Sequence, residues 1–193
     1  MEMLGNRRLG VTQQQAWDAL NDPETLKKCI PGCDKFESTG DNQYSVGLAL
    51  KIGPVSAKFS GKVTLSDIVA PDRYQLSFEG QGGVAGFAKG SSSVSLKPPA
   101  DGGEGCELDY TVQAAVGGKI AQMGQRLIDG AAKSTADDFF KRFDAEMQAR
   151  FGPPPAAEGD SEGEAAGKPG AVAGFMQKLG FGKKAEQDGE SPA

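Results

Sequence analysis

Two short helix signals followed by a long run of strand signals constrain this chain more than any other feature. Thr12-x-x-Gln15 is a capping-box pattern, which marks the start of a helix. Asp22-Pro23 then starts a second helix, with the aspartate as N-cap and the proline at the first helical position. Ile30-Pro31-Gly32 ends it, and strand signals follow at once. Trp17 is expected to pack the first helix against those strands. Two short helices followed by a run of strands predict a curved sheet around a pocket.

Short alternating segments fill residues 35–116. They include KFSGKVTLSDI, RYQLSFEG and CELDYTVQAAV, in which apolar and polar residues alternate with the period of a strand. Gly, Pro and Asp separate these segments at hairpin turns such as 39–42, 70–72 and 100–103. The pattern predicts about six strands in this region, with one more strand over residues 3–11 ahead of the two helices.

A helical period begins after Gly117-Gly118 and continues to about Arg150, an element about 50 Å long at 1.5 Å per residue. Its apolar residues recur three and four positions apart and predict a face packed on the sheet: Ile120, Met123, Gly124, Leu127, Ile128, Ala131, Thr135, Phe139 and Phe143. A strand, two small helices, a strand meander and a long C-terminal helix is the order of the helix-grip fold. In this α+β fold a curved antiparallel sheet surrounds the helix and encloses a cavity.

The sequence contains no histidine, which removes the usual general base and the commonest metal ligand together. Catalysis would rest on carboxylates, Lys, Tyr or Cys, and we expect a protein that is not an enzyme and holds no metal. The net charge of −5 leaves no basic field for nucleic acid. No stretch reaches the roughly 20 apolar residues of a membrane-spanning helix, and no signal peptide is indicated. Three reduced cysteines in the cytoplasm are therefore expected.

Several blocks stand in a fixed order over residues 1–147: Trp17-x-x-Leu20-x-Asp22-Pro23-x-x-Leu26, Ile30-Pro31-Gly32-Cys33, Lys51-Ile52-Gly53-Pro54, Phe59-x-Gly61, Gly80-x-Gly82 and Phe139-Phe140. In this combination the chain resembles the CoxG family of carbon monoxide dehydrogenase subunits, which belongs to the START/Bet v 1-like (SRPBCC) superfamily of lipophilic-ligand binders. The resemblance implies a bacterial accessory protein of a molybdenum hydroxylase, such as a carbon monoxide dehydrogenase-type enzyme. It also implies recruitment of that enzyme to the inner face of the cytoplasmic membrane, and a lipophilic ligand such as an isoprenoid quinone in the cavity.

Large residues at bends of the strands and on the inner face of the long helix are the expected lining of the cavity. These residues are Phe59, Phe78, Phe87, Met123, Leu127 and Ile128. Each of them is equally compatible with a place in the plain hydrophobic core.

The composition changes after the expected helix-grip domain, residues 1–150. Residues 151–170 are rich in Pro, Gly and acidic residues, which is typical of a disordered linker. Residues 171–185 then place apolar side chains three and four positions apart beside lysines: Val172, Phe175, Met176, Leu179 and Phe181 with Lys178, Lys183 and Lys184. Such a segment can lie in a membrane interface or dock in a groove of a partner enzyme, with an inert tail as the alternative. Residues 186–193 are expected to be disordered.

Other interpretations compete with a lipid-binding accessory protein. Cys29 and Cys33 lie close in sequence and Cys106 is distant, but without histidine neither a metal site nor an activated thiol is indicated, and we expect packed or tolerated cysteines. Residues 80–85 superficially match a dinucleotide-binding pattern, but no helix signal follows them. These glycines suit a strand bend or close approach of a ligand. An assembly module without ligand, and a cyclase or hydrolase of the same fold, remain alternatives.

Overall fold

The structure is a computed structural model that describes residues 1–152. Strand β1 (Glu2–Leu9) leads into two short helices, α1 (Gln13–Leu20) and α2 (Pro23–Cys29). Six strands follow: β2 (Cys33–Gly40), β3 (Gln43–Ile52), β4 (Val55–Val69), β5 (Arg73–Gln81), β6 (Phe87–Lys97) and β7 (Cys106–Gly117). A 3-10 turn, η1 (Gly83–Ala85), joins β5 to β6, and a second one, η2 (Ala121–Met123), precedes the long helix α3 (Gln125–Phe151).

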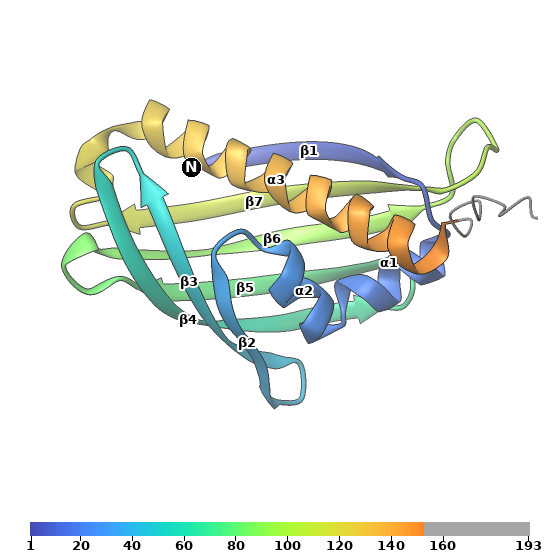
Figure 1. The fold of residues 1–193 in the computed structure, drawn as a ribbon, viewed down its shortest axis with the longest axis horizontal. Helices are drawn as coiled ribbons and strands as arrows, with labels where there is room; N and C mark the ends of the chain where they lie inside the picture. The colour runs from blue at the N-terminus through green and yellow to red at the C-terminus, as the bar shows by residue number, and fades with distance from the viewer. Residues whose placement is uncertain (153–193) are drawn as a thin grey trace, which may run out of the picture. The chain divides into compact units, whose positions relative to one another are not determined.

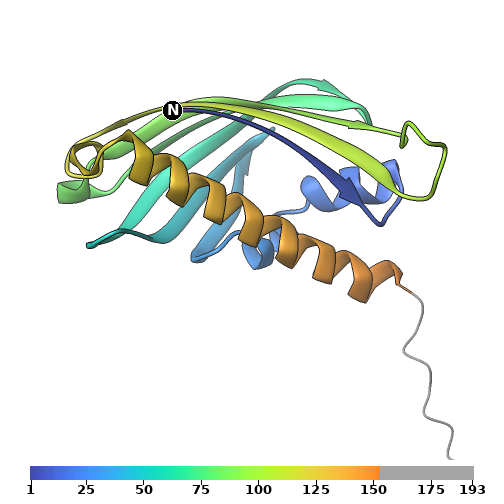
Figure 2. The same ribbon diagram turned by 90° about the horizontal axis from the view of Figure 1, so that it is seen from above.

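The strands form one antiparallel sheet in the order β1-β7-β6-β5-β4-β3-β2. Strands β2 to β7 pair with their neighbours in sequence, whereas β1 pairs with β7. Helices α1 and α2 connect β1 to β2 at opposite edges of the sheet (Figure 1). The sheet is therefore curved but not closed, and Figure 2 shows α3 running along its concave side. This arrangement confirms the predicted helix-grip fold.

The two short helices begin where the sequence patterns predict. The Thr12 hydroxyl accepts a hydrogen bond from the Gln15 amide at 3.2 Å, and the Gln15 side chain accepts one from the Thr12 amide at 3.0 Å. Asp22 accepts a hydrogen bond from the Glu24 amide, and Pro23 occupies the first turn of α2. Side chains thus satisfy backbone N–H groups that a helix leaves unpaired at its start.

The long helix begins later than its apolar periodicity predicts. Gly124 has a φ of +87°, a left-handed conformation that favours glycine, and it separates η2 from α3. Helix α3 therefore begins at Gln125 and contains 27 residues, which gives a length of about 40 Å rather than 50 Å. The first strand is also shorter than predicted, because the chain turns at Gly10 toward the cap of α1.

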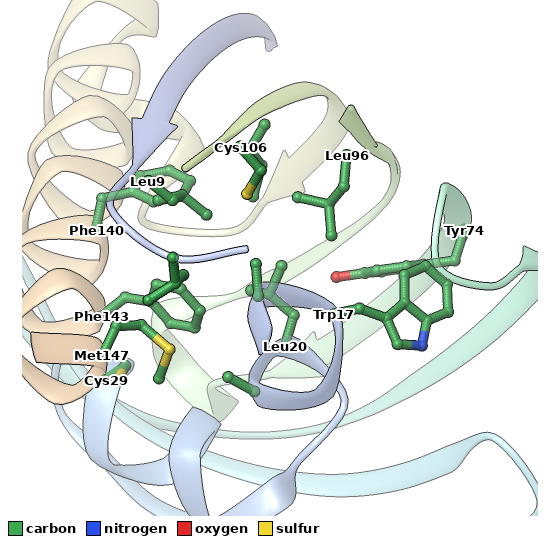
Figure 3. Packing of buried hydrophobic residues seen from close by; sticks show 14 residues of the cluster. Leu9, Trp17, Leu20, Cys29, Tyr74, Leu96, Cys106, Phe140, Phe143 and Met147 are labelled. Atoms are coloured by element: carbon green, nitrogen blue, oxygen red, sulfur yellow. The ribbon is translucent and has the colours of Figure 1, made fainter. Parts of the chain in front are cut away.

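The main hydrophobic core lies where α1, α2 and the C-terminal half of α3 pack on one end of the sheet (Figure 3). Phe143 of α3 is fully buried, and Leu9 and Leu108 are almost fully buried. Trp17 packs edge-on against Tyr74 with ring centroids 5.6 Å apart, so it seals α1 against the sheet as predicted. A fully buried side chain of this size contributes about 1.5–3 kcal/mol. This end of the domain therefore contains its main source of stability.

Ion pairs on the surface also join α2 to α3. Glu146 accepts hydrogen bonds from Lys28 at 3.2 Å and from the Arg150 Nε atom at 2.9 Å, and these bonds lower the pKa of the Glu146 carboxyl. Arg150 also lies 3.5 Å from the carboxylate of Asp22. Exposed pairs of this kind contribute up to about 1 kcal/mol each, so they orient the two helices more than they stabilise the domain.

Candidate functional site

The strand register separates two faces of the sheet. Tyr110 on β7 packs against Phe140 of α3 with ring centroids 5.4 Å apart, so Tyr110 faces the helix. Its register partners, Gly5 on β1 and Val94 on β6, share that face because side chains across a ladder point the same way. The intervening residues point away from α3 and are mainly Ser, Thr, Gln, Lys and Glu. The concave face is therefore apolar, and the face away from α3 is polar.

A second hydrophobic cluster lies at the end of the sheet far from the main core. Its buried members are Phe59 on β4, Ala85 on η1 and Ile120 beside η2. The Ile120 amide donates a hydrogen bond to the Ala85 carbonyl at 3.0 Å, which ties the two 3-10 segments together. Half-buried side chains from β3, β4 and β7 pack around this cluster: Leu48, Leu50, Ile52, Val55, Ala57 and Val116. Each end of the concave face thus has its own packed group.

Small, half-buried residues predominate between the two clusters, in what we call the middle section. On the sheet they are Gly61, Gly80, Ala88, Gly90 and Ala114. On α3 they are Ala131, Ala132 and Thr135, on the helix face that runs from Ile128 to Phe139. These residues stay partly accessible although they lie on the facing sides of the sheet and the helix. The middle section is therefore an accessible apolar surface inside the fold.

Aromatic rings on the concave face lie over glycines of neighbouring strands or, for Phe59, over a glycine of the connection after β5. The ring of Phe78 lies over Gly90, where an added Cβ atom would be 2.9 Å from the ring Cζ atom. The ring of Tyr110 lies over Gly5, and the ring of Phe59 lies over Gly82. Because glycine has no side chain, the rings lie against the sheet surface, which leaves the facing residues of α3 accessible.

Helix α3 is packed unevenly along its length. Its first half buries only Ile128, whereas its second half buries Phe140, Phe143 and Met147. Arg7 of β1 forms an ion pair with Asp137, and its guanidinium carbon lies 5.3 Å from the centroid of the Phe140 ring. These contacts hold the helix from its middle onward. The first half covers the middle section with little packing of its own.

Five of the six residues predicted to line the cavity lie on or beside the concave face. Phe59 and Ile128 are buried, and Phe78 is half-buried in the middle section. Met123 and Leu127 approach Gly53 in the turn between β3 and β4, because an added Cβ atom there would be 3.1 Å from Met123 Cε and 3.0 Å from Leu127 Cδ2. Leu127 is 41% exposed, so its side chain lies at the surface of this end.

The prediction for Phe87 is wrong. Phe87 pairs with Gln81 and Gly117, and its ring lies over Gly117 on the face away from α3, where it is 37% exposed. The left-handed residue Gly86, with a φ of +115°, ends the η1 turn immediately before it and sets the alternation of β6. Ala88 therefore faces inward in place of Phe87.

The sequence predicts Ala131 and Thr135 on the inner face of the long helix, but it does not predict the small residues of β6 and β7 in the middle section. A signal for them exists in the small residues at alternate positions Ala88, Gly90 and Ser92. Gly80 is predicted only as a bend or a point of close approach, and the structure places it on the concave face opposite Gly61. The predicted docking residues Val172, Phe175, Met176, Leu179, Phe181, Lys178, Lys183 and Lys184 lie outside the described residues.

Few ionisable side chains lie around the middle section. Thr135 donates its hydroxyl to the Ala131 carbonyl at 2.8 Å. In residues 1–152 every buried side-chain nitrogen or oxygen has a hydrogen-bond partner, and no three His, Cys, Asp or Glu side chains gather as metal ligands. Burial raises the pKa of the Cys106 thiol to about 11, and desolvation also raises the pKa of Cys29 and of Cys33. The site thus offers van der Waals contact in place of acid–base groups.

An open depression on the described surface lies on the face of the sheet away from α3, and a smaller one lies on the same face. The first depression measures about 890 Å³, and its lining includes Lys62, Ser77, Lys89, Ser91 and Gln113. Most of its lining residues point away from α3 and are exposed. A surface of hydroxyls, amides and charges is that of an ordinary solvated sheet face, and the concave face is the better match for an apolar ligand.

The residues that build both clusters and the middle section fall within one family match. A family model described as the carbon monoxide dehydrogenase subunit CoxG matches residues 5–148. The chain belongs to the CoxG family. This membership confirms the resemblance carried by the sequence blocks. Among curated proteins, none matches the chain.

Solved structures similar to this CoxG family protein share its fold. A conserved protein from Geobacillus kaustophilus is 36% identical, with a TM-score of 0.72 over 77% of this chain and 96% of its own. A START superfamily protein from Mycobacterium smegmatis is 13% identical, with a TM-score of 0.59 over 77% of this chain and 98% of its own. A protein from Thermus thermophilus is also 13% identical, with a TM-score of 0.59 over 78% of this chain and 99% of its own. The START-like fold is thereby confirmed.

No helix in residues 1–152 is long and apolar enough to cross a membrane.

Proposed function

We propose that this chain is a non-catalytic accessory protein of a carbon monoxide dehydrogenase-type molybdenum hydroxylase. In this proposal it brings the enzyme to the inner face of the cytoplasmic membrane and binds a lipophilic molecule, such as an isoprenoid quinone, on its concave face. Membership in the CoxG family supports the enzyme partner. The START-like fold supports a lipophilic ligand.

The accessible middle section is the observation on which the ligand depends. Apolar surface left exposed in a folded protein costs about 25 cal/mol for each Å² that could have been buried. Here half-buried small residues lie on the facing sides of the sheet and of α3, between packed clusters at both ends. Accessible apolar surface of this kind is characteristic of a ligand-binding surface. The small side chains on the sheet and on α3 pack less well against each other than they would against a bulky apolar ligand.

The membrane part of the proposal is supported by the sequence after the described domain. The segment 171–185 combines apolar residues at helical spacing with three lysines. Each lysine near an anionic membrane surface contributes about 1 kcal/mol, so attachment by this segment would be reversible.

The test is native mass spectrometry, with organic extraction, of the full chain purified from a quinone-containing bacterial membrane fraction. Two variants separate the concave face from the rest of the sheet. Ala114→Phe places a ring on the face toward α3, and Ala115→Phe places the same ring one residue further on the opposite, exposed face. The wild type and Ala115→Phe are expected to retain an isoprenoid quinone, and Ala114→Phe is expected to lose it.

A wild-type protein without ligand would overturn the carrier role and leave an assembly module as the function. Equal retention by the two variants would place the ligand elsewhere. Recruitment of the enzyme is tested separately, by co-sedimentation of the purified hydroxylase with vesicles in the presence and absence of the chain. Sedimentation that is independent of the chain would overturn recruitment.

A further inference from the structure

Three connections meet at the end of the domain that holds the second cluster. They are residues 51–55 at the β3–β4 turn, residues 82–89 around η1, and residues 117–126 around η2. Gly53 lies against the side chains of Met123 and Leu127, and Gly86 packs on the backbone of residues 117 and 118. We call these three segments together the basic tip. In Figure 1 they form the end of the sheet opposite α1.

The three segments of the basic tip contain positive charges and no acidic residue, although Lys89 pairs in register with Glu79 of β5. Its cations are Lys51, Lys89, Lys119 and Arg126, all of them exposed. Within residues 1–152 none of the four forms an ion pair. Among the described residues, the other cations of the sheet vary in this respect: Arg8 pairs with Asp101 and Lys97 pairs with Asp109, whereas Lys62 and Arg73 form no ion pair.

The opposite end of the sheet has the opposite charge. Its turns are residues 41–42, 70–72 and 98–105, which contain Asp41, Asp72, Asp101 and Glu104 and neither Lys nor Arg. The connections at the two ends of the strands therefore differ in charge, and Arg73 and Lys97 lie next to the acidic turns. In the field of a negatively charged surface, this distribution turns the basic tip toward that surface and the acidic turns away from it.

Large apolar side chains are exposed at the same tip. Val84 is 85% exposed at the apex of η1, Leu127 is 41% exposed just beyond η2, and Phe87 is 37% exposed at the start of β6. Val84 projects from a tight three-residue turn and does not form part of a flat or hollow surface. Apolar side chains that project from a turn, among unpaired cations, match a lipid interface, where the apolar groups insert and the cations meet the head groups.

We propose that the basic tip docks on an anionic membrane surface, with Val84 inserted among the lipids and Lys119 and Arg126 at the head groups. This inference rests on the proposed function and deepens it, because the membrane contact is placed on the folded domain itself. The same tip adjoins the second cluster and Leu127, so docking brings that end of the concave face to the bilayer. A lipophilic guest then exchanges with the membrane over a short path.

A vesicle partition assay with the full chain tests the proposal. The vesicles contain equal parts of phosphatidylcholine and phosphatidylglycerol, and phosphatidylcholine alone is the neutral control. The tip variant combines Val84→Asp with Lys119→Glu, and a tail variant combines Phe175→Asp with Phe181→Asp. We expect the tip variant to bind anionic vesicles about tenfold more weakly than the wild type, because it loses both insertion and attraction. Both tip positions are exposed, and unchanged fluorescence of Trp17 checks the fold.

A depth measurement distinguishes docking from a general charge effect. Val84→Trp places an indole at the tip, and Ala100→Trp places one in the acidic turn before β7, which is also exposed. Brominated lipids quench indoles that enter the bilayer. We expect quenching of the indole at position 84 and none at position 100, with the buried Trp17 as internal reference.

The outcomes separate the two proposals. If the tip variant partitions like the wild type while the tail variant does not bind, the docking of the tip is overturned and the membrane location stands. If the wild type does not bind anionic vesicles, the membrane location itself is overturned. If the tip variant binds vesicles normally but no longer co-purifies with the hydroxylase, the tip contacts an acidic protein surface and the inference is overturned.

Discussion

The ring of Phe78 on β5 lies over Gly90, the residue that pairs with it on β6. A Cβ atom at position 90 would lie 2.9 Å from the ring and closer still to the carbonyl oxygen of Gln113 on β7. Glycine at this position therefore lets the aromatic ring and two neighbouring strands approach one another, and it keeps the ring flat beneath the middle section.

Gly90→Ala is expected to lower the free energy of unfolding by about 2 kcal/mol, because the added methyl group overpacks a site bounded by backbone. Urea unfolding followed by the fluorescence of Trp17, the single tryptophan, measures the change. Gly40→Ala is the matched control in a strand, since a Cβ atom there meets nothing within 4 Å. Equal losses at the two positions would contradict the packing that we describe.

Phe78 and Phe87 should differ in their effect on a bound ligand. Phe78 faces the middle section, whereas Phe87 lies on the other side of the sheet. Phe78→Ala is expected to weaken retention of the lipophilic molecule by about tenfold, from lost apolar contact. Phe87→Ala should leave retention unchanged. Ligand extracted per mole of protein is the measurement. A larger loss from Phe87→Ala than from Phe78→Ala would place the ligand on the face of the sheet away from α3 and contradict the proposal.

The cap of α2 should give the domain a dependence on pH in the acid range. A hydrogen bond from the Thr25 hydroxyl, followed by bonds from backbone amides and from Arg150, lowers the pKa of Asp22 below its usual 3.8 despite some desolvation. A lowered folded-state pKa stabilises the fold at pH above the unfolded value, and this stabilisation is lost as pH falls through the folded value.

Asp22→Ala is therefore expected to cost about 1 kcal/mol near neutral pH and to cost progressively less below about pH 4. Chemical unfolding of wild type and variant across this range measures the difference. Asp18→Ala, at an exposed position within α1, controls for the loss of a carboxylate. A cost for Asp22→Ala that does not change down to about pH 2 would show that the ionised carboxylate is not what stabilises α2.

The cysteines should differ in reactivity by their burial. Cys29 and Cys106 are buried, and Cys33 is half-buried. Desolvation raises the pKa of all three thiols, that of Cys106 to about 11, so the reactive thiolate is scarce. We expect iodoacetamide to label Cys33 alone, and slowly, in the native protein, and to label all three after unfolding. Mass spectrometry of digested protein identifies the sites, and rapid native labelling of Cys106 would contradict its burial.

Local sequence patterns are sufficient to predict the order of the helices and strands. Thr12 with Gln15, and Asp22 with Pro23, fix two helix starts through bonds made within a few residues, and the structure contains them as predicted. Alternation between turns is likewise enough to predict six strands from β2 to β7, because each hairpin joins neighbours in sequence.

The face of an individual residue depends on details that the sequence pattern does not contain. Phe87 follows a left-handed glycine, and one residue of difference in a strand moves a side chain to the other face. Gly124 has the same kind of effect on α3, since helical periodicity continues through it while the backbone does not. The small sheet residues of the middle section escape prediction for another reason: they have no large side chain to mark them, and only the three-dimensional arrangement places them opposite α3.

Because the main core and the second cluster hold the two ends of the concave face, the alanines between them contribute little to either cluster. Exchanging one small side chain for another at Ala88, Ala114 or Ala132 reshapes the interior without removing a contact from either cluster. Under the proposed function, stability and ligand preference would then depend on different positions of one chain. A few substitutions among these alanines would change the ligand while the two packed clusters keep their contacts.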